Sequence, residues 1–158
     1  NYLPNHKCLK NIKLDIRSIS DNDFKEIDVV IHLANIANDP AVDLNPNLSW
    51  EVNVLASQQL ADYACRNNVK QFLYASSGSV YGVKTEDKVT EELPLVPLSV
   101  YNKTKMVAER IFLSYKDKMQ IHCIRPATVC GVSPRMRLDV SVNMFAYQAL
   151  KNKKVTVY

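Results

Sequence analysis

The sequence predicts an α/β fold in which a parallel sheet is covered by crossover helices on both faces. Two observations support this prediction. Short apolar runs alternate along the chain with longer segments that have the period of an amphipathic helix. The apolar runs also lack strict alternation of polar and apolar residues, which is typical of strands that are buried on both sides.

Composition narrows the class of protein. The chain has 158 residues, 47% of them hydrophobic, and this length suits one domain with a sizeable core. No apolar run approaches the roughly 18 residues of a membrane span, and the N-terminus lacks the zones of a signal peptide, so we expect a cytoplasmic protein. The net charge of +4 comes from scattered basic residues, and no nucleic-acid partner is expected.

The four cysteines are widely spaced and form no Cys-x-x-Cys pair. They are Cys8, Cys65, Cys123 and Cys130. This spacing indicates neither a zinc site nor a disulfide framework, and we expect no metal.

Four apolar runs predict strands, and they lie at residues 12–16, 28–34, 71–76 and 119–124. A further apolar run at residues 155–158 suggests a later strand. The runs are separated by segments long enough to hold crossover helices, as parallel pairing requires.

Residues 45–67 form the first segment with helical period. Its apolar residues recur every three to five positions, at Leu48, Val52, Leu55, Leu60 and Ala64. We therefore predict a helix with one buried stripe over this range.

Two more helices are predicted further along the chain. Residues 100–116 place Val107, Ile111 and Tyr115 on one stripe. Residues 139–151 open on an acidic residue and close on a basic one, which suits the helix dipole. Residues 82–99 between the third strand and the helix contain acidic residues and two prolines, and they are predicted to be a loop.

Glycine is scarce, because only Gly78, Gly82 and Gly131 occur. The sequence thus has no glycine-rich turn whose backbone amides would contact a pyrophosphate. Two alternatives follow. Either the sequence is an incomplete piece of a dinucleotide-binding fold, or the fold does not bind dinucleotides.

Tyr101 and Lys105 lie four residues apart, on one face of the predicted helix. A tyrosine with its ordinary pKa near 10 is a poor base at neutral pH, and a neighbouring ammonium group favours its phenolate. The pair can therefore serve acid/base chemistry. The same spacing taken alone also fits a solvated helix surface.

Hydroxyl and carboxamide side chains follow two predicted strands. Ser76 ends the predicted strand at residues 71–76, Ser77 and Ser79 follow it, and Asn35 follows the strand at residues 28–34. Open α/β sheets bind ligands at the carboxyl ends of their strands. A serine-rich turn by itself is also consistent with a helix cap.

Asp15 lies at the end of the first predicted strand. It can accept a hydrogen bond from the amino group of an adenine, or it can cap the turn that follows the strand. Both interpretations stay open at this point.

Taken together and in this order, the motifs resemble those of the extended short-chain dehydrogenase/reductase family, in its NAD-dependent epimerase/dehydratase branch that acts on nucleotide sugars. The resemblance covers nearly the whole chain. The matching motifs are Leu14-Asp15-Ile16-Arg17, His32-Leu33-Ala34, Trp50-Glu51-Val52-Asn53-Val54, Ser76-Ser77-Gly78-Ser79-Val80-Tyr81-Gly82, Tyr101 with Lys105, and Ile124-Arg125-Pro126-Ala127-Thr128-Val129-Cys130-Gly131.

The resemblance implies a role for individual residues. Tyr101 would be the catalytic acid/base, Lys105 would bind the nicotinamide ribose and lower the tyrosine pKa, and Ser77 would hydrogen-bond the sugar oxygen. The residues implied to contact NAD are Asp15, Ile16, Leu33, Ala34, Asn35, Asn53, Ala75, Ser76, Tyr101, Lys105 and Pro126. The residues implied to contact substrate are Ser77, Gly78, Ser79, Thr128 and Asn143.

The resemblance also bears on the reaction. Family dehydratases carry an Asp-Glu pair where this chain has Gly78 and Ser79, so dehydration is disfavoured. A nucleotide-sugar epimerase that works through a keto intermediate is the first hypothesis. An NAD(P)H-dependent keto-sugar reductase and a non-catalytic Rossmann-type binding protein are the alternatives, and the choice of NAD or NADP is open.

Family members begin with a strand and a glycine-rich turn and end with a substrate-binding lobe, and the sequence shows neither. We therefore expect residues 1–131 to be a partial Rossmann core, residues 132–158 to begin the substrate-binding region, and the sequence as written to be inactive. Arg135 and Arg137 either contact substrate or cover a helix start. The family also implies a homodimer, formed by the helices at residues 45–67 and 100–116.

Overall fold

The computed structural model describes residues 6–37, 39–134 and 136–157. It divides into two compact units. The larger unit, Lys13–Pro126, contains the sheet. The smaller unit, Asn1–Ile12 with Ala127–Tyr158, contains the last helix.

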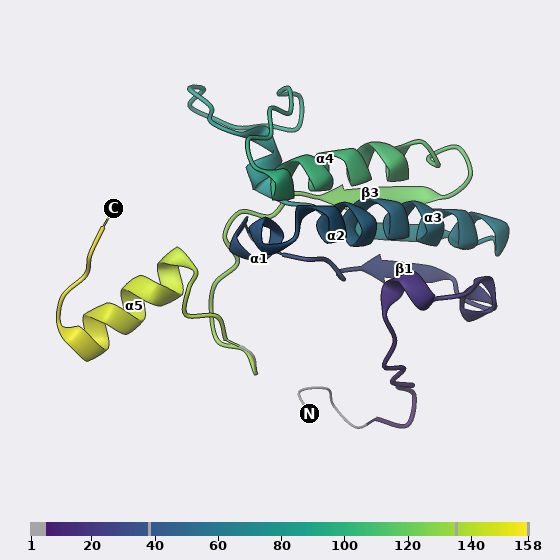
Figure 1. Ribbon diagram of the computed structural model, residues 1–158, viewed down its shortest axis with the longest axis horizontal. Helices are drawn as coiled ribbons and strands as arrows, with labels where there is room; N and C mark the ends of the chain where they lie inside the picture. Colours follow the sequence, from purple (N-terminus) through teal and green to yellow (C-terminus); the bar gives the residue numbers. More distant parts are fainter. Residues whose placement is uncertain (1–5, 38, 135, 158) are drawn as a thin grey trace. The chain divides into compact units, whose positions relative to one another are not determined.

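Over the described residues, the sheet has three parallel strands in the order β1-β2-β3. They are β1 (Val29–His32), β2 (Gln71–Ala75) and β3 (Gln120–Ile124). The arrows of β1 and β3 point the same way in Figure 1. The predicted strands at residues 28–34, 71–76 and 119–124 are confirmed, each with a shorter hydrogen-bonded core.

The predicted strand at residues 12–16 is wrong. Residues 9–15 have no regular structure, and the 3-10 helix η1 (Ile16–Ser18) follows them. Ile12 and Leu14 are exposed. A strand needs a partner for its backbone N–H and C=O groups, and none of the described strands pairs with this run.

The predicted strand at residues 155–158 is also wrong where the chain is described. Residues 155–157 have no regular structure, and the Val157 side chain is exposed. Tyr158 lies outside the described residues. An apolar run of this length forms a strand only where a neighbouring strand completes its hydrogen bonds.

The helix predicted at residues 45–67 is present, but it is built from three consecutive segments. These are α2 (Pro46–Trp50), the π-helix η3 (Glu51–Leu55) and α3 (Ala56–Arg66). A short helix, α1 (Asp39–Leu44), precedes them and was not predicted. The wide π turn rotates the faces of the helix. As a result, Leu55 is 64% exposed although its spacing predicted burial, and Asn53 is buried.

The two later helices are confirmed as α4 (Val100–Leu113) and α5 (Ser141–Asn152). The side chain of Ser99 caps α4 by accepting the backbone N–H of Asn102. Two 3-10 helices occur earlier in the chain, η2 (Asp21–Phe24) and η4 (Gly78–Tyr81). The predicted loop at residues 82–99, which follows η4, contains neither helix nor strand.

The buried face of α4 differs from the predicted stripe. Val107 and Ile111 are only half-buried, whereas Lys105 and Glu109 face the interior together with Phe112. Charged residues can occupy this face because each has a polar partner there.

The core of the larger unit lies between the sheet and the helices α3 and α4. Phe72 of β2 stacks on Phe112 of α4 with ring centroids 4.6 Å apart, and Leu60 of α3 belongs to the same cluster. The opposite sheet face is less covered, since Ile31 of β1 is 64% exposed and Leu73 of β2 is half-buried. The predicted parallel α/β class is confirmed in partial form, since α3 and α4 pack against one face of the described sheet (Figure 1).

Among the helices of the described residues, none combines the length and the apolar character that crossing a membrane requires.

His32 is a buried titratable group at the end of β1. Its ring stacks on Tyr74, and its Nε2 lies 3.1 Å from the hydroxyl oxygen of Ser57. Burial, and to a lesser extent the charge of Lys105, lowers the pKa of His32 to about 4. The folded chain therefore holds this imidazole neutral at a pH where the unfolded chain protonates it.

We expect the free energy of unfolding to fall as the pH drops from about 6.5 to about 4. In that window the unfolded chain gains a proton that the folded chain does not take up, and the total loss is about 3 kcal/mol. His32→Phe should flatten this part of the profile, since phenylalanine keeps the aromatic contact without titrating. Urea denaturation at several pH values measures it. The exposed His122 provides the control, and a slope that disappears in His122→Gln but persists in His32→Phe would contradict the assignment.

Candidate active site

Lys105 of α4 reaches the carboxyl end of the sheet. Its Nζ donates to the backbone oxygen of Ala75, at the last residue of β2, over 2.7 Å. The ammonium also lies 4.9 Å from the ring centroid of Tyr74 and 5.7 Å from that of Tyr101. Lys105 is only 3% exposed, and burial lowers its pKa to about 8 while Glu109 acts in the opposite direction.

A second Tyr-x-x-x-Lys pair, Tyr147 and Lys151 on α5, has the same spacing. There the ammonium donates to the phenol oxygen over 2.6 Å, and both side chains are exposed. The spacing alone thus produces an ordinary surface contact on α5. What distinguishes Tyr101 and Lys105 is that Lys105 is buried and bound to the end of a strand.

The serine turn lies at the same edge of the sheet. The backbone N–H of Ser76 donates to the oxygen of Ile124, and the N–H of Gly78 donates to the oxygen of Pro126, each over 2.8 Å. These bonds hold the turn beside the end of β3. Ser77 is the N-cap of η4, and its side chain accepts the N–H of Ser79.

Two side chains connect the turn to α4. The Ser77 and Ser79 hydroxyl oxygens are 2.7 Å apart, and the Ser79 hydroxyl donates to Oδ1 of Asn102 over 2.5 Å. Asn102 directly follows Tyr101 on α4. Contacts made by Ser77, Tyr101 and Lys105 themselves, or by the residues next to them, therefore bring these three residues to one edge of the sheet.

The glycine that ends the turn is required by its surroundings. Gly82 has a φ of +70°, and a Cβ built on it would lie 2.1 Å from the backbone oxygen of Val96. Any side chain at this position would clash with backbone and strain the turn.

Asn53 holds the segment that follows β1. Its Oδ1 accepts the N–H of Ile36 over 2.8 Å, and its Nδ2 donates to the oxygen of Ile36 and to the hydroxyl of Thr104 on α4. Leu33 and Ala34 of this segment are exposed, and the Asn35 side chain donates to the oxygen of Ala34. The buried carboxamide thus fixes the backbone next to three of the residues implied to contact NAD.

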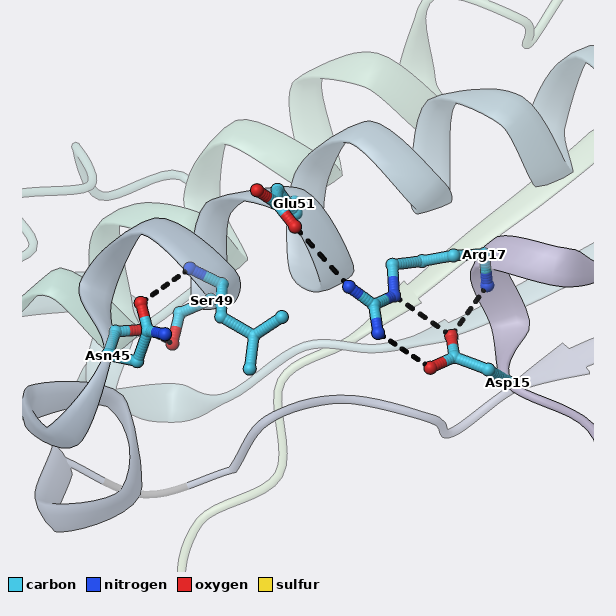
Figure 2. Close-up of polar contacts among 6 residues, drawn as sticks. Asp15, Arg17, Asn45, Ser49 and Glu51 are labelled. Atoms are coloured by element: carbon cyan, nitrogen blue, oxygen red, sulfur yellow. Dashed lines mark hydrogen bonds and ion pairs between the residues drawn. The ribbon is translucent and has the colours of Figure 1, made fainter.

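Asp15 is held by Arg17, as Figure 2 shows. Its Oδ1 accepts the backbone N–H of Arg17, which is the capping role, and its carboxylate also accepts two bonds from the guanidinium. Arg17 extends to Glu51 of η3 over 3.3 Å. Hydrogen bonds from Arg17 lower the pKa of Asp15 to about 2, so Asp15 is a carboxylate at neutral pH. Ile16, the neighbouring residue, is half-buried.

Figure 2 also shows how the helix that carries Glu51 begins. Asn45 caps α2 by accepting the N–H of Leu48 on its Oδ1, and its backbone oxygen accepts the Ser49 hydroxyl. The cap satisfies helix N–H groups that would otherwise lack partners.

An ion pair between Arg125 and Glu109 contacts the end of the serine turn. Arg125, directly after β3, donates from Nε and Nη2 to the carboxylate of Glu109 on α4, the Nη2 bond being 2.7 Å long. Its Nη1 donates to the hydroxyl of Tyr81 at the end of η4 over 2.8 Å. Glu109 is fully buried. One guanidinium therefore ties together strand, helix and turn.

In the smaller unit, Asn143 of α5 is buried and bonded to backbone. Its Oδ1 accepts the N–H of Gly131 over 3.0 Å, and its Nδ2 donates to the oxygen of Arg137 over 2.8 Å. Arg137 forms an ion pair with Asp139. Thr128 is exposed and outside helices and strands. Arg135 lies outside the described residues.

Three residues at this edge escaped the sequence analysis: Asn102, Glu109 and Tyr81. Asn102 and Glu109 lie on the buried face of α4, which differs from the predicted apolar stripe, so the helical period gave no signal for them. Tyr81 was noted only as part of a motif. Its contact with Arg125 joins residues 44 positions apart, which spacing along the chain cannot reveal.

Ser76 has the feature expected beside a ligand. Its side chain is buried, and its Oγ has no hydrogen-bond partner among the described residues. Buried hydroxyls are normally hydrogen-bonded, so an orphan at the carboxyl edge of the sheet is compatible with a partner supplied by a bound molecule.

Comparisons with known proteins agree with this geometry. The profile of the NAD dependent epimerase/dehydratase family matches residues 2–158. The uncharacterized UDP-glucose epimerase YtcB of Bacillus subtilis (strain 168) is 34% identical over 142 residues, which is 84% of this chain and 42% of that protein.

Two solved structures are similar to the chain. UDP-glucuronic acid 4-epimerase from Bacillus cereus, in complex with UDP-glucuronic acid and NAD, has a TM-score of 0.77 at 31% identity. This likeness covers 93% of the present chain and 47% of that one. UDP-N-acetylglucosamine 4-epimerase from Methanobrevibacter ruminantium M1, in complex with UDP-N-acetylmuramic acid, has a TM-score of 0.82 at 26% identity over 96% and 50% of the two chains. The chain thus spans half or less of the length of these three relatives.

We expect Glu109→Ala to lower the free energy of unfolding by about 3–5 kcal/mol, because the guanidinium of Arg125 is then left partly buried without its carboxylate. Replacing both partners, as in Glu109→Leu with Arg125→Met, should cost less than Glu109→Ala alone. Chemical denaturation of the single and double variants measures the difference. A double variant that loses the sum of the two single effects would show that the side chains do not act as a pair.

Proposed function

This chain belongs to the NAD-dependent epimerase/dehydratase family, and from that premise we propose that it acts as an NAD-dependent nucleotide-sugar epimerase. One observation carries the proposal. The buried ammonium of Lys105 is fixed to the end of β2 and lies 5.7 Å from the ring centroid of Tyr101, at the sheet edge where α/β proteins bind ligands.

The residues at this edge fit NAD. The Ser76 hydroxyl lacks a partner among the described residues, and the Lys105 ammonium has two N–H groups besides the one directed at Ala75. Bound NAD would take a hydride from a sugar carbon and return it. We propose that these residues hold it: Asp15, Ile16, Leu33, Ala34, Asn35, Asn53, Ala75, Ser76, Tyr101, Lys105 and Pro126.

Tyr101 and Lys105 would divide the proton chemistry between them. Tyr101 takes the proton of the sugar hydroxyl as the alcohol becomes a ketone and returns it in the reverse step. The nearby ammonium favours the phenolate form that this step needs. Since the pKa of Lys105 is about 8, the group is mostly a cation at neutral pH and loses its charge above that value.

Ser77 would donate a hydrogen bond to the reacting sugar oxygen and stabilise the charge that develops on it. Gly78 and Ser79 follow it where the family's dehydratases have an acidic pair. A turn with no carboxylate at these positions supports epimerisation over loss of water, because elimination requires its own acid and base.

The proposed substrate is a nucleotide-diphosphate sugar. The resemblance assigns it Ser77, Gly78, Ser79, Thr128 and Asn143, with residues 132–158 beginning the substrate-binding region. The similar Bacillus cereus structure contains UDP-glucuronic acid and NAD, which supports this class of ligand. We further propose a homodimer formed through α3 and α4, and light scattering in solution would measure its mass.

The reaction itself can be tested with the purified full-length protein, NAD and a panel of UDP-sugars that includes UDP-glucose and UDP-glucuronic acid. We expect an epimerised sugar by NMR with no net change in nicotinamide absorbance, because the hydride is returned. Stoichiometric oxidation of NADH with a keto sugar would identify a reductase instead. Failure to bind either cofactor by calorimetry would favour a non-catalytic protein.

We expect Tyr101→Phe to lower kcat by about 10²–10⁴-fold, since the ring remains but the proton acceptor is lost. Affinity for NAD should be retained, because Lys105 and the strand ends are unchanged. Tyr147→Phe is the matched control, since it removes the hydroxyl of the exposed Tyr-x-x-x-Lys pair on α5. Equal activity of Tyr101→Phe and the unmodified protein would remove Tyr101 from the reaction.

A further inference from the structure

A chain of three side chains fixes the hydroxyl of Ser77. Ser77 Oγ is 2.7 Å from Ser79 Oγ, and Ser79 Oγ is 2.5 Å from Oδ1 of Asn102. The backbone N–H of Ser79 also points at Ser77 Oγ over 3.3 Å. Asn102, which anchors the chain, is only 9% exposed and lies in the first turn of α4.

The chemistry of the anchor fixes the direction of each hydrogen bond. A carboxamide oxygen can only accept, so the single hydroxyl proton of Ser79 is directed at Asn102. Ser79 therefore has no proton to offer Ser77 and must accept from it. Ser77 is left as the donor of the pair, and one of its lone pairs receives the Ser79 N–H.

This polarity matters at a site where one proton has to move to the correct base. If Ser77 acted as an acceptor, it would compete with Tyr101 for the proton of the sugar hydroxyl. As a donor, Ser77 can transfer its hydrogen bond from Ser79 to the sugar oxygen and assist both the alcohol and the ketone. The Ser79 oxygen then serves as the acceptor when no substrate is bound.

We propose that Ser79 and Asn102 are positioning residues that hold the Ser77 hydroxyl as a hydrogen-bond donor toward the reacting sugar oxygen. The inference rests on the function proposed above and gives Ser79 a role through Ser77 besides its expected substrate contact. Asn102 also links that role to the helix turn that carries Tyr101, so the donor and the base keep one relative orientation.

The test compares Ser79→Ala, Ser79→Thr and Asn102→Ala with Ser77→Ala in the epimerase assay. Ser79→Ala and Asn102→Ala should each lower kcat about tenfold, less than Ser77→Ala, because the donor remains but its orientation is lost. KM should change little in Asn102→Ala, because no substrate contact is proposed for Asn102, and the affinity for NAD should change little in both variants. Ser79→Thr should restore kcat, since threonine keeps the hydroxyl. The double variant Ser79→Ala with Asn102→Ala should lose no more kcat than Ser79→Ala alone, because both residues act through the same hydroxyl of Ser77.

A second readout does not depend on turnover. In ¹⁵N-resolved NMR spectra, Ser79→Ala should shift the side-chain amide of Asn102 and the backbone amide of Ser77, and Ser79→Thr should restore both. The control is Ser114→Ala, whose hydroxyl bonds to Ile111 at the far end of α4. It should leave both readouts unchanged.

The outcomes separate the two proposals. An active protein whose Ser79→Ala variant matches it in kcat, or whose Asn102 resonance does not move, overturns the positioning role and leaves the epimerase standing. A protein that epimerises no nucleotide sugar overturns both.

Discussion

The buried pair of Glu109 and Arg125 is the constraint on which the carboxyl edge of the sheet depends. A fully buried carboxylate is tolerated only with a charged partner, and here the partner extends from the end of β3. Because Arg125 also binds the Tyr81 hydroxyl, the pair fixes the end of the serine turn against α4. The ammonium of Lys105, one helical turn before Glu109, is thereby directed at the end of β2. Such a pair fixes the positions of the segments that it joins more than it adds to the net stability of the fold.

Polar contacts of the same kind recur around that edge. Asn53 joins the segment after β1 to Thr104, Asn102 joins the serine turn to the start of α4, and Lys105 joins the end of β2 to the middle of α4. In each case α4 is joined to the carboxyl end of a strand or to the segment that follows it, directly or, for Thr104, through Asn53 of η3. Reacting groups on separate segments need such fixed spacing, since small displacements between them lower the rate of reaction.

The two Tyr-x-x-x-Lys pairs illustrate the difference between a motif and a site. Tyr147 and Lys151 share the spacing of Tyr101 and Lys105, yet they form an exposed contact on α5. Only Lys105 is desolvated, which lowers its pKa to about 8. The electrostatic effect of an ammonium on a nearby phenol grows as water is excluded. Burial of Lys105 therefore strengthens its effect on the phenol of Tyr101.

The sequence by itself determined the parallel α/β class, three strands of the described sheet, the main helices and the order of the candidate site motifs, because apolar period and residue spacing are local properties. It failed at residues 12–16, where an apolar run has no partner strand, and at Leu55, where a π turn rotates the helix faces. Tertiary structure alone decided which polar residues are buried. Glu109 meets Arg125, and Ser79 meets Asn102, across 16 and 23 positions. Such pairings arise when separate elements pack together, and no local pattern encodes them.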